Sequence, residues 1–154
     1  MHVRYPRVGL SLLLFVVIAG LAGCSRFNRD WRAAQPANPP TSGIDGRWQG
    51  TWLSAANGHE GELRAILTRT LEDTYHARFR ARFWGIMAYC YSLDLEVQPG
   101  PPGYWRLEGG ADLGRLAGGR YECRGTASTN ELFATYDSKR DHGRFSLSRL
   151  SNDP

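Results

Sequence analysis

Apolar and polar residues alternate along most of the chain between Gly43 and Leu150. The alternation is most regular over residues 75–83, where every odd position is apolar and every even position is basic. Period-two alternation is typical of a β-strand with one buried face and one wet face. Gly, Pro, Asn and Asp interrupt the pattern at short intervals, as expected for turns between strands. The sequence therefore predicts an all-β domain over residues 43–150.

Eight strands are predicted in this domain, and short segments connect most of them. Short connections make consecutive strands antiparallel neighbours. Such strands can stack as a sandwich or close as a barrel. Sequential hairpins favour an eight-stranded antiparallel up-and-down barrel, because closure removes exposed edges. The predicted strands are Arg47–Leu53, Glu62–Thr70, Thr74–Phe83, Ile86–Val97, Tyr104–Leu113, Arg120–Ala127, Glu131–Asp137 and Arg144–Leu150.

Two hairpins around the third predicted strand have charges that can be matched across strands. In the hairpin with the fourth strand, the expected register puts His76 near Asp94. In the hairpin with the second strand, it puts Glu62 near Arg82. Opposite charges on neighbouring strands offset part of the repulsion within the basic face.

The inward face of the third and fourth predicted strands is rich in aromatic side chains. These residues either fill the barrel or line a cavity, because an eight-stranded barrel has room for side chains or for one small ligand. Tyrosine suits a cavity, since its ring is apolar and its hydroxyl can orient a ligand. The candidate ligand-binding residues are Tyr75, Phe79, Phe83, Tyr89, Tyr91 and Leu93.

Cys90 and Cys123 fall on opposite faces of their predicted strands. Cys90 is on the outward face of the fourth strand, and Cys123 is on the inward face of the sixth. A disulfide needs Cα atoms about 4.4–6.8 Å apart, which opposite faces do not allow without distortion. We therefore expect both cysteines to be unpaired. An oxidising compartment favours the alternative, a disulfide between them.

The first 23 residues have the layout of a secretory signal. Two arginines precede an apolar run over residues 8–22, which is shorter than the about 20 residues of a membrane span. The run ends in Leu21-Ala22-Gly23-Cys24, which resembles a bacterial lipobox. The resemblance implies removal of residues 1–23 and attachment of lipid to Cys24. We therefore expect a lipoprotein whose partner is a membrane.

Residues 24–42 are rich in proline and polar residues, which predicts a disordered linker. At about 3 Å per residue, such a linker holds the barrel up to roughly 50 Å from the bilayer. Residues 151–154 are expected to form a short tail. Ser25 stands where an aspartate favours the inner membrane in many lipoproteins. The resemblance therefore implies a location in the cell envelope, at the outer membrane facing the periplasm in preference to the inner membrane.

Charge and composition argue against several functions. Without Arg4 and Arg7, which fall in the predicted signal, 17 basic residues face 15 acidic ones. This near balance gives no focused basic surface for nucleic acid. The histidines and cysteines are scattered, so no metal site or cofactor is expected. The Ser, His and Asp of residues 137–143 fit a polar hairpin loop, and no convergent titratable group predicts an enzyme.

Gly46-Arg47-Trp48, at the start of the first predicted strand, resembles the G-x-W signature of lipocalins and the wider calycin group. The resemblance implies that Trp48 closes one end of the barrel and that an arginine of the last strand, here Arg149, packs over it. The domain is compact for a lipocalin and is similar in size to avidin-type barrels. The whole chain is also similar to small uncharacterised bacterial lipoproteins, which imply no activity.

Two functions are compatible with these patterns. The first is a membrane-anchored, lipocalin-like barrel that binds a small apolar ligand or an envelope partner. The second is a structural envelope protein with a fully packed barrel and no small-molecule ligand. A cavity inside the barrel distinguishes them. The sequence does not indicate an oligomeric state.

Overall fold

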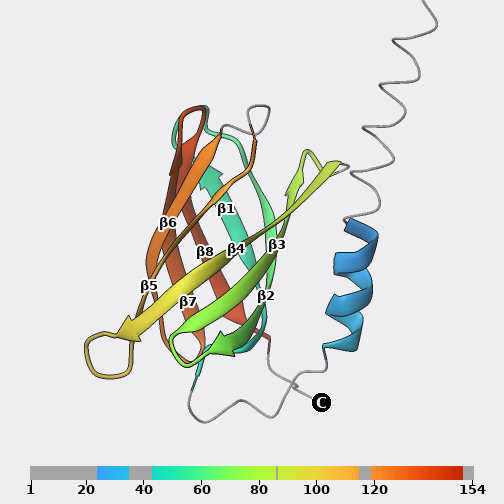
Figure 1. Ribbon diagram of the computed structural model, residues 1–154. Helices are drawn as coiled ribbons and strands as arrows, with labels where there is room; N and C mark the ends of the chain where they lie inside the picture. Colours follow the sequence, from blue (N-terminus) through green and yellow to red (C-terminus); the bar gives the residue numbers. More distant parts are fainter. Residues whose placement is uncertain (1–23, 35–42, 86, 115–118, 151–154) are drawn as a thin grey trace, which may run out of the picture.

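The computed structural model describes residues 24–34, 43–85, 87–114 and 119–150 (Figure 1). The predicted signal, the second part of the predicted linker and the tail lie outside these residues. The described strands are β1 (Gly46–Ser54), β2 (Glu60–Leu71), β3 (Thr74–Phe83), β4 (Met87–Pro99), β5 (Trp105–Asp112), β6 (Arg120–Ala127), β7 (Glu131–Ser138) and β8 (His142–Arg149).

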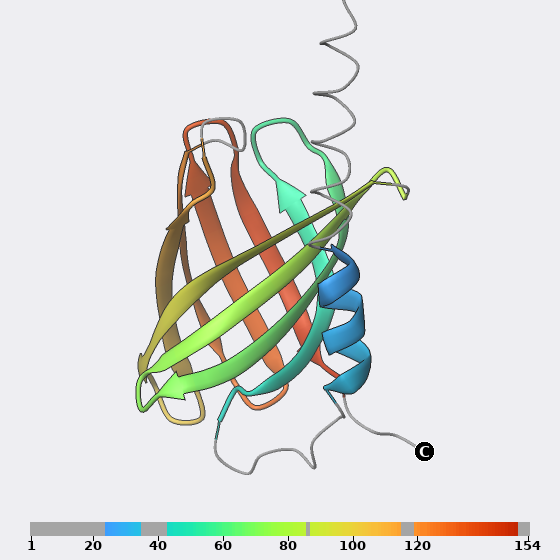
Figure 2. The same cartoon turned by 45° about the vertical axis from the view of Figure 1, so that its right-hand side comes forward.

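The eight strands form one closed barrel in chain order, and β8 pairs with β1 to complete it. Every neighbouring pair is antiparallel, and the tilted strands wrap around a common interior (Figure 2). Each observed strand end lies within two residues of its predicted position. The all-β, eight-stranded antiparallel up-and-down barrel that the sequence predicts is therefore confirmed.

The register of the hairpins around β3 is also the predicted one. His76 Nδ1 lies 2.7 Å from Asp94 Oδ1, and Arg82 Nη1 lies 3.3 Å from Glu62 Oε2. Exposed pairs of this kind contribute about 0–1 kcal/mol each. They are therefore compatible with the register and add little to the stability of the barrel.

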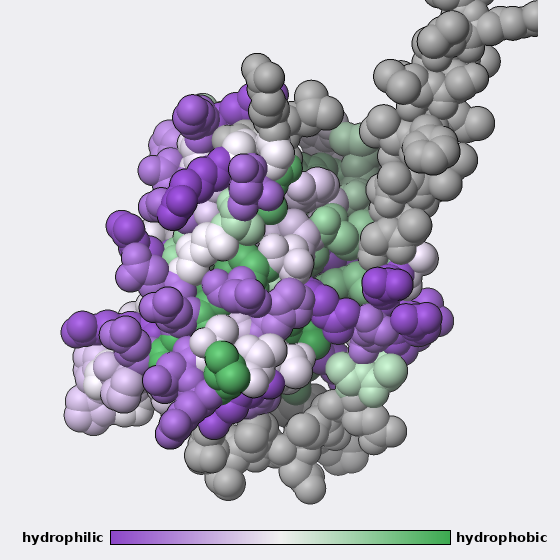
Figure 3. All heavy atoms as spheres, viewed as in Figure 1, coloured by the Kyte–Doolittle hydropathy of each residue, from purple (hydrophilic) through white to green (hydrophobic). Residues whose placement is uncertain are grey.

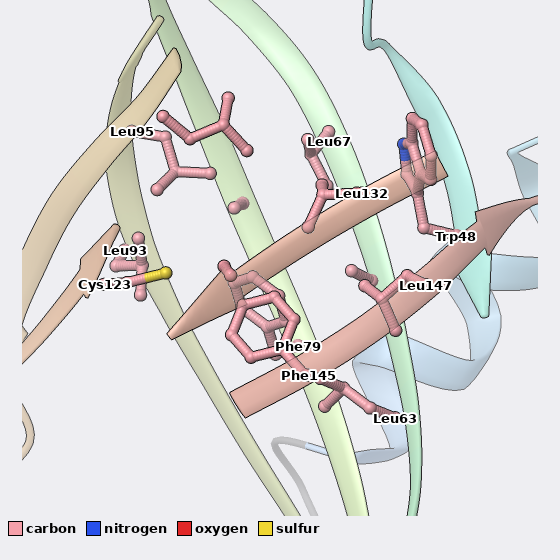
Figure 4. Packing of buried hydrophobic residues seen from close by; sticks show 14 of the residues in the cluster. Trp48, Leu63, Leu67, Phe79, Leu93, Leu95, Cys123, Leu132, Phe145 and Leu147 are labelled. Atoms are coloured by element: carbon pink, nitrogen blue, oxygen red, sulfur yellow. The ribbon is translucent and has the colours of Figure 1, made fainter. Parts of the chain in front are cut away.

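The interior of the barrel is packed with side chains over most of its length. Phe79 is buried against Phe145, with ring centroids 5.8 Å apart, and both lie among leucines of β2, β4, β7 and β8 (Figure 4). Cys123 is part of this cluster, and burial raises the pKa of its thiol to about 12. The inward face that the alternation predicts is therefore the core.

One end of the barrel is closed by Trp48 and Arg149. The Trp48 ring is fully buried, and its Nε1 donates to the Ile44 carbonyl at 3.0 Å. The Arg149 guanidinium lies 4.7 Å from the centre of this ring. It also donates to the carbonyls of Asp45 and Gly43, each at 2.6 Å. The carbonyls of the segment that precedes β1 are therefore hydrogen-bonded at the sealed end of the barrel.

The described part of the predicted linker is a helix, residues 24–33, and not an extended segment. The helix lies against the outside of the barrel (Figure 1). Phe27 and Trp31 on its buried side form a second apolar cluster with Ile66 on the outer face of β2. Asp30 accepts from Arg78 of β3 at 2.5 Å. The expectation of a linker is wrong here, because apolar residues spaced one turn apart find a complementary patch on the barrel.

Cys24, at the start of this helix, forms a disulfide with Cys90 of β4. Cys90 is on the outer face, as predicted, but the expectation that it is unpaired is wrong because the docked helix brings Cys24 to that face. Cys123 is buried and unpaired, as expected. Among the described residues, no helix is long and apolar enough to cross a membrane.

Candidate functional site

A pocket of about 150 Å³ opens at the end of the barrel opposite to Trp48. At this end lie the turns that connect β1 to β2, β3 to β4 and β7 to β8. The pairing of β4 with β5 begins only at Asp94 and Gly110, so the first part of β4 extends beyond that ladder. The pocket is lined by Trp52, Leu63, Ala81, Phe83, Tyr89, Tyr91, Leu113, Tyr121, Tyr136, Ser138, Asp141 and Phe145.

Four tyrosines form a continuous row of rings along one wall of the pocket. Neighbouring centroids are 5.8 Å apart for Tyr89 and Tyr91, and 5.6 Å apart both for Tyr91 and Tyr121 and for Tyr121 and Tyr136. The row crosses from β4 to β6 and β7, because these inward positions face one another at the open end. It presents aromatic faces and hydroxyl groups to the same small space.

A carboxylate is held at the mouth of the pocket by two hydroxyls. Asp141 Oδ1 accepts from Ser54 Oγ at 2.5 Å, and Asp141 Oδ2 accepts from Tyr136 Oη at 3.2 Å. The turn between β7 and β8 fixes Asp141, whose backbone N–H donates to Ser138 Oγ at 3.1 Å. His142 is exposed and pairs in register with Asp137. Residues 137–143 thus form the polar hairpin that the sequence predicts.

Burial extends the pH range over which the pocket tyrosines are neutral. The pKa values of Tyr121 and Tyr136 are raised above the ordinary value of 10.0, in both cases mainly by desolvation. The nearby carboxylate of Asp141 raises the pKa of Tyr136 further. Both phenols stay protonated at neutral pH. The Tyr136 O–H is donated to Asp141, so its oxygen can only accept from a bound molecule.

The stability of the fold should decrease at alkaline pH because of these tyrosines. Their pKa values are raised in the folded state, so stability is constant below about pH 10 and falls above it as the unfolded chain ionises. Each such tyrosine costs up to about 1.4 kcal/mol per pH unit in that range. Urea unfolding at pH 9 and pH 11 measures the decrease. Tyr121→Phe should reduce it and Tyr104→Phe, at an exposed position, should not. An equal decrease in both variants would contradict this origin.

The structure brings only part of the predicted ligand set to the pocket. Phe83, Tyr89 and Tyr91 line it. The other three are elsewhere: Leu93 is in the packed core, Phe79 stacks on Tyr91 at 5.0 Å, and Tyr75 is near the closed end. Alternation predicts that a residue points inward, but its height along the barrel decides whether it meets the pocket.

Tyr75, a predicted ligand-binding residue, contacts the side chain of Arg69. Its hydroxyl accepts from Arg69 Nη2 at 2.6 Å, and the Arg69 guanidinium lies 5.2 Å from its ring centre. This contact helps to seal the end where Trp48 lies. Tyr75 therefore lies at the closed end and does not line the pocket.

Several pocket residues were missed by sequence reasoning. Trp52 follows the barrel-closing Trp48 by four residues on the same face of β1. Its Nε1 donates to the Arg82 carbonyl at 3.2 Å. Tyr136 and Asp141 come from the last hairpin. The inward parity of Tyr121 and Tyr136 in their strands was the available signal. It could not show that the rings of β6 and β7 meet those of β4.

Two shallow grooves of about 510 Å³ each lie on the outer face of the barrel. Their linings include Arg124, which pairs with Glu108 at 3.0 Å, and other charged outward residues. Hydrophilic side chains cover much of the face seen in Figure 3. These grooves are lined mainly by polar and charged strand residues, whereas the smaller pocket at the open end has an aromatic lining.

Within the described part of the chain, no three His, Cys, Asp or Glu side chains gather as metal ligands. Comparison with protein-family models and with curated proteins finds no match for the chain. The proposed function therefore rests on the geometry of the barrel and its pocket.

Proposed function

We propose that this protein is a membrane-anchored, lipocalin-like barrel that binds a small apolar molecule at its open end. The supporting observation is the asymmetry of the barrel. One end is sealed by Trp48 and Arg149, while the other holds an aromatic pocket with a partly open wall. An interior that serves only as a packed core would be more stable with this space filled.

The size and lining of the pocket define the class of ligand. A volume of about 150 Å³ suits one aromatic ring or the end of an alkyl chain, below the roughly 300–1,000 Å³ of most ligand sites. The tyrosine row favours a planar ring, which stacks on aromatic faces. Asp141 accepts hydrogen bonds at the mouth. A ring that carries one hydroxyl or amino donor is the preferred ligand.

The proposed anchor is lipid on Cys24, for which the lipobox resemblance is the support. The lipid of such a residue is joined to its sulfur as a thioether. One sulfur cannot hold both this thioether and the disulfide to Cys90. The lipidated protein therefore has Cys90 as a thiol, and the helix is then docked by its apolar cluster and by Asp30. We place this form at the outer membrane facing the periplasm.

Binding of p-cresol to the full-length protein tests the pocket. The expected result is saturable binding, measured by calorimetry, that Ala81→Leu weakens at least tenfold because the larger side chain fills the space. Ala88→Leu, the same change at an exposed position of β4, should leave the affinity unchanged. Absence of saturable binding to the unmodified protein, or equal affinity in both variants, would contradict the proposed site.

A structural barrel without a ligand is the second candidate. It is favoured by the packed interior between Phe79 and the closed end. In that case, Ala81→Leu should stabilise the fold by filling an empty space, and p-cresol should not raise the unfolding midpoint of the unmodified protein. Ligand binding instead raises that midpoint in proportion to the logarithm of ligand concentration.

A further inference from the structure

The hairpin between β3 and β4 carries large apolar side chains that the barrel leaves exposed. Trp84 is 69% exposed, Met87 50% and Tyr89 39%. Trp84 has a φ of +49°, in the left-handed region that disfavours a bulky residue. The Trp84 ring meets the ring of His59 edge-on at 5.7 Å but contributes nothing to the core of the barrel. The three residues are called the hairpin patch below.

The start of the described chain is fixed beside the hairpin patch. Cys24 Sγ lies 3.9 Å from the carbonyl oxygen of Ala88, the residue between Met87 and Tyr89. The helix that follows is docked at its other end by Trp31, over whose ring the Arg47 and Arg64 guanidinium groups lie at 5.4 and 5.3 Å. In Figure 1 and Figure 2 the hairpin splays away from the side of the barrel, close to the beginning of the blue helix.

We propose that the hairpin patch lies in the membrane–water interface and that the open end of the barrel faces the bilayer. This inference rests on the proposed anchor at Cys24. In the lipidated form, which lacks the disulfide, the packing of Phe27 and Trp31 against Ile66 still holds the start of the helix beside β4. An acyl chain on Cys24 then enters the bilayer near the hairpin patch, so the patch meets the lipid surface without a separate encounter. Trp and Tyr are the residues that prefer this interface, because their rings are apolar and their N–H and O–H groups remain hydrated.

The orientation also defines where the ligand comes from. Phe83 and Tyr89 belong both to the hairpin region and to the lining of the pocket. With the patch in the interface, the mouth of the pocket opens toward the lipid. The occupant is then an apolar molecule that partitions into membranes, and it reaches the pocket without crossing water.

Quenching of tryptophan fluorescence by brominated phosphatidylcholine tests the orientation. The protein extracted from membranes is reconstituted into vesicles that contain this lipid. Of the five tryptophans, Trp31, Trp48 and Trp52 are buried in the protein, and Trp105 starts β5 near the closed end. We expect strong quenching of the unmodified protein, and loss of most of it in Trp84→Phe. Trp105→Phe is the matched control and should retain the quenching.

Flotation of the same vesicles separates failure of the orientation from failure of the anchor. If the protein floats with the vesicles but Trp84→Phe leaves the quenching unchanged, the proposed orientation is overturned and the anchor stands. Loss of quenching in Trp105→Phe instead would show that the closed end faces the bilayer. If the protein does not float, the anchor fails and the orientation fails with it.

Discussion

Full-length protein that carries Cys24→Ser should leave the membrane fraction almost completely, whereas Cys90→Ser protein should remain there. Serine at position 24 removes the sulfur that holds the proposed lipid and also removes the disulfide to Cys90. Serine at position 90 removes the disulfide alone. The pair of variants therefore separates anchoring from disulfide formation, and fractionation of cell membranes measures the outcome. Retention of the Cys24→Ser protein in the membrane would refute the lipid anchor.

Counting free thiols in the protein without substitutions gives an independent check of the lipid on Cys24. When the chain is unfolded without reductant, the lipidated form should expose two alkylatable thiols, Cys90 and Cys123. The disulfide form exposes only Cys123, which is the unpaired cysteine of the structure. Mass spectrometry of the alkylated protein distinguishes the two forms. One thiol per chain in membrane-extracted protein would mean that Cys24 carries no lipid on its sulfur.

Trp48→Ala should cost about 3–5 kcal/mol of folding free energy, the range for removing a large buried aromatic side chain. The ring is fully buried, and its loss also leaves the Arg149 guanidinium without the aromatic face that it covers. Because domains of this kind are stable by about 5–15 kcal/mol, the change removes much of the total. Urea unfolding at neutral pH measures it. Phe133→Ala, at a half-exposed outward position of β7, should cost less than about 1 kcal/mol. A loss of similar size in both variants would show that Trp48 does not close the barrel.

The strands and their pairing were predictable because the signal for them is local. In β3, residues two apart point to the same side, so alternation along residues 75–83 fixes which side chains face the core. Short turns then leave each strand next to its sequence neighbour. The pairing of His76 with Asp94 follows from the same two facts.

The helix over residues 24–33 was not predictable in this way. It is held by contacts with residues far along the chain, such as Phe27 against Ile66 and Asp30 with Arg78. A short amphipathic segment among polar residues is only marginally helical by itself. The proline-rich composition of residues 24–42 predicted a linker, although Phe27 and Trp31, one helical turn apart, dock on the barrel.

For the proposed lipid anchor, the helix changes the expected distance between the barrel and the membrane. An extended linker would hold the barrel up to roughly 50 Å from the bilayer. The docked helix instead fixes Cys24 against β4, at the open end of the barrel. The sulfur of the proposed lipid attachment thus lies beside Ala88, next to the hairpin patch.

The sequence by itself determined the number of strands, their order, their inward faces and Cys24 as the candidate for lipid attachment, because each depends on neighbouring residues along the chain. Only the tertiary structure decided which end is sealed by Trp48 and Arg149, which tyrosines form the pocket and which cysteine Cys24 meets. These features depend on the height of each residue along a closed barrel and on the docking of a remote helix. Both arise from packing between residues far apart in the chain, for which periodicity contains no signal.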